Sequence, residues 1–153
     1  MVKKAIVFSL FFLILGSLSG FITDEAVLSG WYNQLNKPLI TPPNWIFTPM
    51  WFAIYVLMGF SIAIIYDTNT QYTNPALVFF GFSFIFNILW TVIFFVIQSL
   101  DIAFINIIVI DITLIVSIYY FYKIDKKAFY LLLPYAAWIL FATYLSAYIS
   151  IYN

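Results

Sequence analysis

The side chains of this sequence that could do chemistry stand inside long apolar runs. Asp111 and Asn87 each lie near the middle of such a run. A lone carboxylate at membrane depth costs on the order of 2.5 to 3.5 kcal/mol, so Asp111 must face a protein interior, water or a partner. Asn87 needs hydrogen-bond partners for the same reason. Pairing between helices is the alternative explanation for both residues.

Several kinds of chemistry are excluded because the chain has no Cys and no His. Disulfides, thiolate nucleophiles, Ser-His-Asp triads, zinc sites and haem held by Cys or His all require these residues. We therefore expect no metal site and no required cofactor. The six Lys and six acidic residues cancel, and no basic tract is present. A nucleic-acid partner is excluded, because its binding depends on clustered positive charge.

The composition indicates that the solvent of this protein is lipid. Of the 153 residues, 65% are hydrophobic and only 8% are charged, against roughly 25% charged residues in soluble domains. Five runs reach the roughly 20 residues that a helix needs to cross a membrane, and they are too long and too continuously apolar for barrel strands. These runs are Ala5 to Ile22, Ile46 to Tyr66, Ala76 to Gln98, Ile102 to Tyr122 and Ala128 to Tyr152.

The sequence thus predicts an all-α membrane protein, a five-helix bundle that forms one domain over residues 1–153. The later helices are expected to begin with a capping oxygen at or near the first turn, supplied by Thr48, Asn74, Asp101 and Asp125. Five of the six lysines fall at the amino terminus and in the fourth loop, and only Lys37 falls on the opposite side. Positive charge stays on the cytoplasmic side. We expect a cytoplasmic amino terminus, with the first loop and the carboxyl terminus outside a bacterial plasma membrane.

The first apolar run has an alternative interpretation as a signal peptide, because small residues follow its apolar stretch. A retained helix is favoured, since the apolar run continues past these residues. Gly16 and Gly20 also have the spacing that lets two membrane helices approach closely.

The connection from Thr23 to about Trp45 differs from the rest of the chain. Four of the six prolines and three of the five tryptophans fall between Trp31 and Trp51. Proline restricts the backbone and aromatic rings pack on apolar surface, so we expect an ordered lid. The alternative is a belt of aromatic residues at headgroup level, but such a belt has no need of prolines.

Helical periodicity gathers rings with small or polar residues on three faces. These faces carry Trp51, Tyr55, Met58 and Ile62 in the second run, Asn87, Trp90, Thr91 and Phe94 in the third, and Tyr135, Trp138, Ala142 and Leu145 in the fifth. Ordinary packing is the default interpretation of any one face. Together they could line a cavity for a flat, mostly apolar ligand, with Ala142 leaving room.

Motifs along nearly the whole chain resemble one family. The motifs are Trp31-Tyr32-x4-Lys37-Pro38, Pro42-Pro43-x3-Phe47-x-Pro49-x-Trp51, Tyr55-x2-Met58-Gly59, Asn87-x2-Trp90 and Leu133-Pro134-Tyr135-x2-Trp138-x2-Phe141-Ala142. They resemble the tryptophan-rich sensory proteins (TspO), relatives of the mitochondrial translocator protein or peripheral benzodiazepine receptor. The resemblance implies a five-helix membrane bundle with a Pro- and Trp-rich first loop. It also implies a pocket for porphyrins, notably protoporphyrin IX, and for isoquinoline carboxamide or benzodiazepine compounds.

The resemblance further implies which residues form that pocket. They are Tyr32, Pro42, Trp51, Asn87, Trp90, Trp138 and Ala142, with Asp111 nearby, and the helical faces add Tyr135. In some bacterial relatives the tryptophans that match Trp51 and Trp138 take part in light- and oxygen-dependent breakdown of protoporphyrin. An indole can supply an electron to an excited macrocycle, so these two residues are the candidate catalytic residues.

Two features depart from the family pattern. Nothing after Lys127 is basic, so the carboxyl-terminal sterol motif of the mitochondrial relatives is not complete near Tyr144. The third run offers only Gly81 and Ser83 as small residues for a homodimer. Two other pairs of small residues could serve a dimer instead, Gly16 with Gly20 and Ala142 with Ser146.

The leading functional hypothesis is a membrane receptor or sensor that binds a tetrapyrrole under the first loop and degrades it slowly in light. A small transporter or channel for a porphyrin or another solute, using Asp111 as its titrating group, is the alternative. The paired repeats and broken helices typical of transporters are absent from the sequence. A scaffolding protein without a ligand is the third hypothesis.

Overall fold

The computed structural model describes residues 1–153, and five of its helices are long and apolar enough to cross a membrane, as predicted. No strand is present. In chain order the elements are α1 (Val2–Leu28), α2 (Trp31–Gln34), η1 (Asn44–Ile46), α3 (Phe47–Asp67), α4 (Thr73–Thr91), η2 (Val92–Val96), α5 (Leu100–Ile124) and α6 (Lys126–Tyr152).

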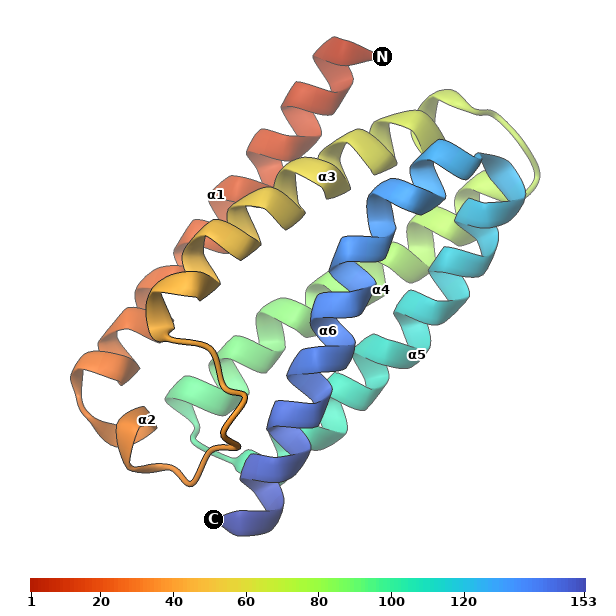
Figure 1. The fold of residues 1–153 in the computed structure, drawn as a ribbon. Coiled ribbons are helices and arrows are strands. Elements are labelled where there is room, and N and C mark those ends of the chain that lie inside the picture. The colour runs from red at the N-terminus through yellow and green to blue at the C-terminus, as the bar shows by residue number, and fades with distance from the viewer.

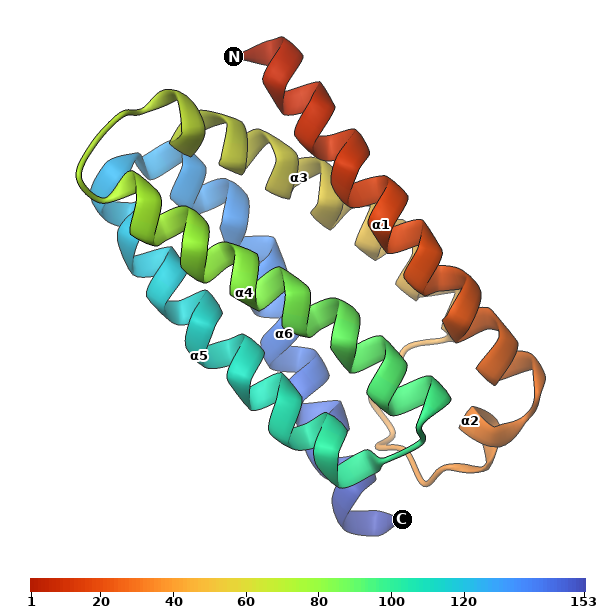
Figure 2. The same cartoon turned by 180° about the vertical axis from the view of Figure 1, so that it is seen from behind.

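The helices form a ring around the long axis of the bundle (Figures 1 and 2). Helix α1 packs along α3, α3 contacts α6, α6 contacts α5, and α5 packs along α4. The ring closes between α4 and α1, which touch more sparsely than the other neighbours. With five crossings, the amino and carboxyl termini lie at opposite ends of the molecule.

Helix α1 is longer than the sequence predicted. It continues past Ile22 to Leu28, so the connection expected to start at Thr23 starts instead at Ser29. The polar residues after Ile22 do not end the helix, because no glycine or proline interrupts the backbone before Gly30. Gly30 adopts a positive φ of 83° and turns the chain into α2. The additional turns of α1 bring more of its residues beside the first loop.

The amino-terminal end of the bundle is closely packed by small residues and hydroxyl groups. Gly59 lies so close to Ser9 that a side chain at position 59 would clash with it. Ser9 Oγ donates to the carbonyl of Val56 over 3.1 Å, and Ser61 Oγ donates to the carbonyl of Ala128 over 2.7 Å. Small residues allow membrane helices to approach in this way, and they leave this half of the bundle filled.

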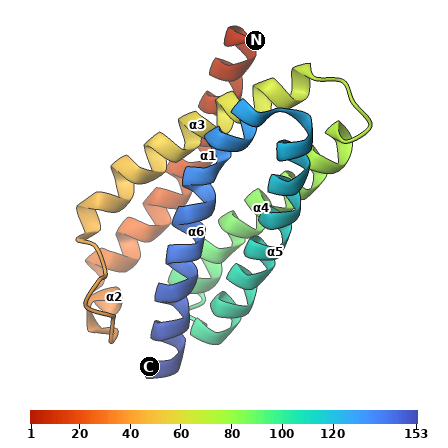
Figure 3. The ribbon, with the colours of Figure 1, turned by 45° about the vertical axis from the view of Figure 1, so that its right-hand side comes forward.

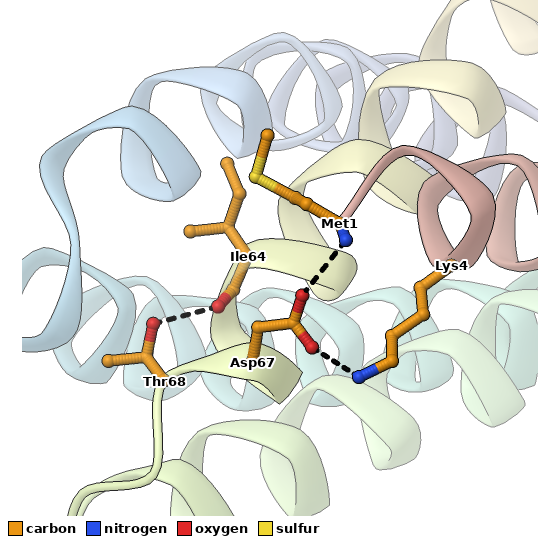
Figure 4. A network of polar contacts seen from close by, with 5 residues as sticks. All are labelled: Met1, Lys4, Ile64, Asp67 and Thr68. Atoms are coloured by element: carbon orange, nitrogen blue, oxygen red, sulfur yellow. Dashed lines mark hydrogen bonds and ion pairs between the residues drawn. The ribbon is translucent and has the colours of Figure 1, made fainter.

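Charged groups join α1 and α3 at the same end (Figure 4). The amino-terminal nitrogen of Met1 lies 3.5 Å from Asp67, and the ammonium of Lys4 bonds the other carboxylate oxygen. Thr68 Oγ1 donates to the carbonyl of Ile64 over 2.8 Å and closes the end of α3. The contact therefore fixes the first turns of α1 against the last turn of α3.

One of the four predicted helix caps is confirmed, since neither Thr48 nor Asn74 caps its helix: the N-caps of α3 and α4 are Ile46 and Tyr72, without a side-chain hydrogen bond. Asp125 Oδ1 accepts from the backbone N–H groups of Lys127 and Ala128, over 2.7 and 3.0 Å, and so caps α6. Asp101 does not cap α5, because that helix begins one residue earlier and its N-cap is Ser99. The Asp101 carboxylate instead accepts from Ser150 Oγ over 2.6 Å and connects α5 to α6.

Candidate functional site

A cavity of about 430 Å³ occupies the half of the bundle that is nearer the carboxyl terminus. Its walls come from α1, α3, α4, η2 and α6, and residues of α2 and η1 cover its end. No residue of α5 lines it. In Figure 3, α5 lies beside α4 and α6, on the side of the bundle away from α2 and the first loop. The volume falls in the range of small-molecule sites, which is roughly 300 to 1,000 Å³.

Aromatic rings from α3 and α6 form one wall. Trp51 stacks on Tyr55 with ring centroids 5.3 Å apart and an interplanar angle of 23°. The edge of Trp138 meets Trp51 at 6.4 Å and 86°, and Phe47 packs on Trp138 at 5.7 Å. Both indoles line the cavity. These rings offer a flat ligand a broad aromatic surface held in place by ring–ring contacts.

The opposite wall comes from the end of α4 and the π-helical turn η2. Trp90 stacks on Phe94 at 4.8 Å and 18°, and Phe95 meets Tyr32 at 5.8 Å. A π turn inserts a residue into the helix and is frequent at functional sites. Here Phe94 and Phe95, which are consecutive, both line the cavity.

Two glycines of α1 shape the cavity from its third side. Gly16 lies directly against the ring of Tyr55, and any side chain at position 16 would collide with that ring. A Cβ at Gly20 would meet nothing within 4 Å, because the helix faces open cavity there. Gly16, Gly20, Ala142 and Ser146, the small residues named as possible dimer surfaces, all line the cavity, and the dimer stays a prediction.

Two buried polar atoms on the cavity wall have no protein partner. They are Nε1 of Trp90 and Oγ of Ser146, whose residue is 2% exposed. Buried polar groups are nearly always hydrogen-bonded, so an unpaired one needs an explanation. An indole N–H can only donate, whereas a hydroxyl can donate or accept. A ligand acceptor would satisfy the indole N–H, and a ligand donor or acceptor would satisfy the hydroxyl.

Hydrogen bonds attach the first loop to the carboxyl end of α6 and to α2. The backbone N–H of Asn36 donates to Asn153 Oδ1 over 2.8 Å, and the Asn36 side chain donates to the carbonyl of Tyr152 over 3.0 Å. Lys37 Nζ donates to the carbonyl of Tyr32 and lies 4.3 Å from its ring centroid. Burial lowers the pKa of Lys37 and raises the pKa of Tyr32, so the phenol stays protonated at neutral pH.

Comparison with known proteins identifies the family. The model of the TspO/MBR family matches residues 7–152. The chain belongs to the TspO/MBR family. It is 36% identical to the tryptophan-rich protein TspO of Archaeoglobus fulgidus over 141 residues, which cover 92% of this chain and 91% of that protein.

Other members of the TspO/MBR family are similar over most of the chain as well. The tryptophan-rich sensory protein of Cereibacter sphaeroides is 31% identical over 137 residues, covering 88% of this chain and 85% of that protein. The translocator protein of Sus scrofa is 28% identical over 141 residues, covering 88% and 83%. The similarity therefore extends from prokaryotic to mammalian members.

The structure brings most of the predicted site residues of this TspO/MBR member to one cavity. Those that line it are Tyr32, Trp51, Asn87, Trp90, Trp138 and Ala142. They come from four different helices, α2, α3, α4 and α6. Asn87 is only 7% exposed, so its amide reaches the cavity from a buried position.

Three predicted residues do not line the cavity. Asp111 belongs to α5, and its carboxylate accepts from Thr143 Oγ1 of α6 over 2.8 Å without lining the cavity. Tyr135 is fully buried behind Trp51, 3.3 Å from Ser83 Oγ. Pro42 lies in the loop just before η1, outside the lining. The position of Asp111 gives no support to transport through the cavity by that residue.

Sequence reasoning missed the contribution of α1 to the site. Nine residues of this helix line the cavity, namely Leu13, Gly16, Ser17, Ser19, Gly20, Phe21, Thr23, Asp24 and Val27. A signal was present, because small and polar residues recur at helical spacing within an otherwise apolar helix. The same spacing is typical of a helix-packing surface, so it does not by itself indicate a cavity.

Proposed function

We propose that this protein is a membrane receptor that binds a tetrapyrrole of the protoporphyrin IX type in the internal cavity. The observation that carries the proposal is the placement of two indoles, Trp51 and Trp138, on one wall of a mostly apolar cavity in a TspO/MBR family member. Apolar walls with a few converging polar groups are typical of small-molecule sites. Flat isoquinoline and benzodiazepine compounds would fit the same walls.

Each wall has its own part in binding. The ring of the ligand would stack on the aromatic surface of Trp51 and Trp138, where desolvation and ring contacts favour it. The unpaired N–H of Trp90 and hydroxyl of Ser146 would bind an acceptor atom of the ligand. The first loop would hold the ligand from above through α2, which Lys37 and Asn36 keep in place.

The proposed orientation follows from the lysines. Lys3 and Lys4 lie at the amino-terminal end with the α5–α6 turn, which carries Lys123, Lys126 and Lys127. Positive charge of this kind stays in the cytoplasm. The cavity and the first loop would then lie in the outer half of a plasma membrane.

The receptor assignment is tested by titrating detergent-solubilised protein with protoporphyrin IX and following the Soret band. The double variant Trp51→Phe with Trp138→Phe should bind at least about tenfold more weakly, because both indole surfaces are lost. Trp45→Phe is the matched control, since Trp45 is 71% exposed and does not line the cavity. Equal affinity for the parent and the double variant, at equal thermal stability, would contradict the assignment.

A slow photochemical reaction is a second candidate function, favoured by the contact between the two indoles. An indole within contact of an excited porphyrin can supply an electron, with dioxygen as the oxidant. Under light and air, the parent should bleach the bound porphyrin faster than either Trp51→Phe or Trp138→Phe. The expected control result is no bleaching in the dark or without oxygen, and equal bleaching by all variants would refute the role.

A further inference from the structure

A second hollow, of about 280 Å³, lies on the surface between the first turns of α1 and the end of α3. It is called the α1–α3 groove below, and it is lined by Lys3, Lys4, Val7, Phe8 and Tyr66. Residues four apart share one face of a helix. Val7 therefore lies one turn further along α1 from Lys3, and Phe8 one turn further from Lys4. The groove has a basic end and an apolar end.

The apolar end of the α1–α3 groove is open to the surroundings of the protein. Val7 is 63% exposed and Tyr66 is 55% exposed. The ring of Phe8 packs on the ring of Tyr66, with centroids 5.8 Å apart and an interplanar angle of 59°, so the two helices share one aromatic wall. Both helices are long and apolar enough to cross a membrane. Acyl chains are therefore the medium that this end of the groove meets.

The basic end of the groove carries more positive charge than its one acid can neutralise. Asp67 is shared between the amino group of Met1 and the ammonium of Lys4 (Figure 4). Lys3 is exposed and takes part in neither ion pair. The ammonium of Lys4 also lies 5.0 Å from the ring centroid of Tyr66, which keeps it at the groove. Three positive groups therefore meet one carboxylate, and the groove attracts an anion.

We propose that the α1–α3 groove binds one anionic phospholipid, of which phosphatidylglycerol is the simplest example. Its phosphate lies at the ammonium groups of Lys3 and Lys4, and one acyl chain runs along Val7 and Phe8. Basic pockets between membrane helices on the cytoplasmic side bind anionic headgroups in this way. A soluble anion would leave the apolar end of the groove unused, so a lipid is favoured. The site is separate from the proposed receptor function, because no residue lines both the groove and the cavity.

The experiment measures lipid binding to detergent-solubilised protein by native mass spectrometry, which counts the lipids bound to each molecule. Phosphatidylglycerol is compared with phosphatidylcholine that has the same acyl chains. The parent should bind the first phosphatidylglycerol at least about tenfold more tightly than phosphatidylcholine. Lys3→Gln should reduce this preference by about fivefold, because one cation of the groove is lost. Lys3→Arg keeps the charge and should keep the preference of the parent.

Lys127→Gln is the matched control, because Lys127 is an exposed lysine at the same end of the bundle and does not line the groove. It should leave the preference unchanged, and glycerol 3-phosphate, which has a phosphate but no acyl chain, should not displace the lipid. Equal losses in Lys3→Gln and Lys127→Gln, displacement by glycerol 3-phosphate, or a parent without preference would each overturn the lipid site. Porphyrin titration of Lys3→Gln should match the parent, so such a failure leaves the receptor assignment intact.

Discussion

Gly16 determines where the ring of Tyr55 can lie, and through it the position of Trp51. The ring occupies the space that a side chain at position 16 would need, and Trp51 stacks on the same ring with centroids 5.3 Å apart. The absence of a side chain on α1 is therefore part of the aromatic wall. Gly16 therefore shapes the site through the position that it leaves open for Tyr55.

Gly16→Ala should lower both thermal stability and porphyrin affinity, because the new methyl group displaces Tyr55 from its packed position. Overpacking of this kind costs about 1 to 3 kcal/mol. The measurement is a thermal melt in detergent together with a Soret titration. Gly81→Ala is the control, since a Cβ there meets nothing within 4 Å. Equal behaviour of the two variants would contradict the role of Gly16.

Ala142→Leu should weaken porphyrin binding by at least about tenfold while leaving the fold intact, because the larger side chain fills part of the cavity. Ala142 lines the cavity, whereas Ala53, on α3, is exposed away from it. Ala53→Leu makes the same change on the outer surface and should bind like the parent. Wild-type affinity in Ala142→Leu would show that the ligand does not occupy this part of the cavity.

Residues on regular helical faces were predictable, and residues whose role depends on packing were not. Trp51 and Trp138 were expected at a cavity, and they line it, because helical spacing fixes which side chains share a face. Tyr135 shares that face with Trp138, yet it lies one layer deeper behind Trp51. Periodicity gives direction around a helix but not depth.

At the scale of elements, the apolar runs determined the five crossings, and local hydrogen bonding determined their ends. Helix α1 continues to Leu28 because each added turn satisfies its own backbone groups until Gly30. The π turn η2 was not predictable, because it depends on how Phe94 and Phe95 pack against Tyr32 and Trp31. Its two consecutive rings on the cavity wall are a result of that packing.

Asp125 is the one acid that caps a membrane-spanning helix here, and its removal should lower the stability of the protein measurably. Asp125→Ala should destabilise the protein by about 1 kcal/mol, because two backbone N–H groups at the start of α6 lose their acceptor. Asp125→Asn keeps an oxygen in place and should retain most of the stability. The check is the thermal midpoint, and equal losses in the two variants would show that the charge rather than the cap matters.

At the scale of the whole molecule, the two ends of the bundle have different roles. The end that holds Lys4 and Asp67 is closely packed, and the end that holds the first loop and Asn153 encloses the cavity. Helix α5 supports α4 and α6 without reaching the cavity, which places Asp111 outside it. In this arrangement α5 supports the bundle, whereas α1, α3, α4 and α6 would contact a ligand.

Asp67→Asn should loosen the first turns of α1 without changing porphyrin affinity, because the ion pair lies at the opposite end from the cavity. The expected result is faster amide exchange near Lys4 and a Soret titration that matches the parent. High salt should produce a similar increase in exchange in the parent, since the pair is exposed to solvent. A marked loss of affinity would mean that the two ends are coupled.

The most direct test is a density map of the protein with protoporphyrin IX bound. The predicted result is a flat density inside the bundle, against Trp51 and Trp138, with Trp90 Nε1 near an acceptor atom of the ligand. Density confined to the outer surface of the helices, with the cavity empty or filled by detergent, would contradict the receptor assignment.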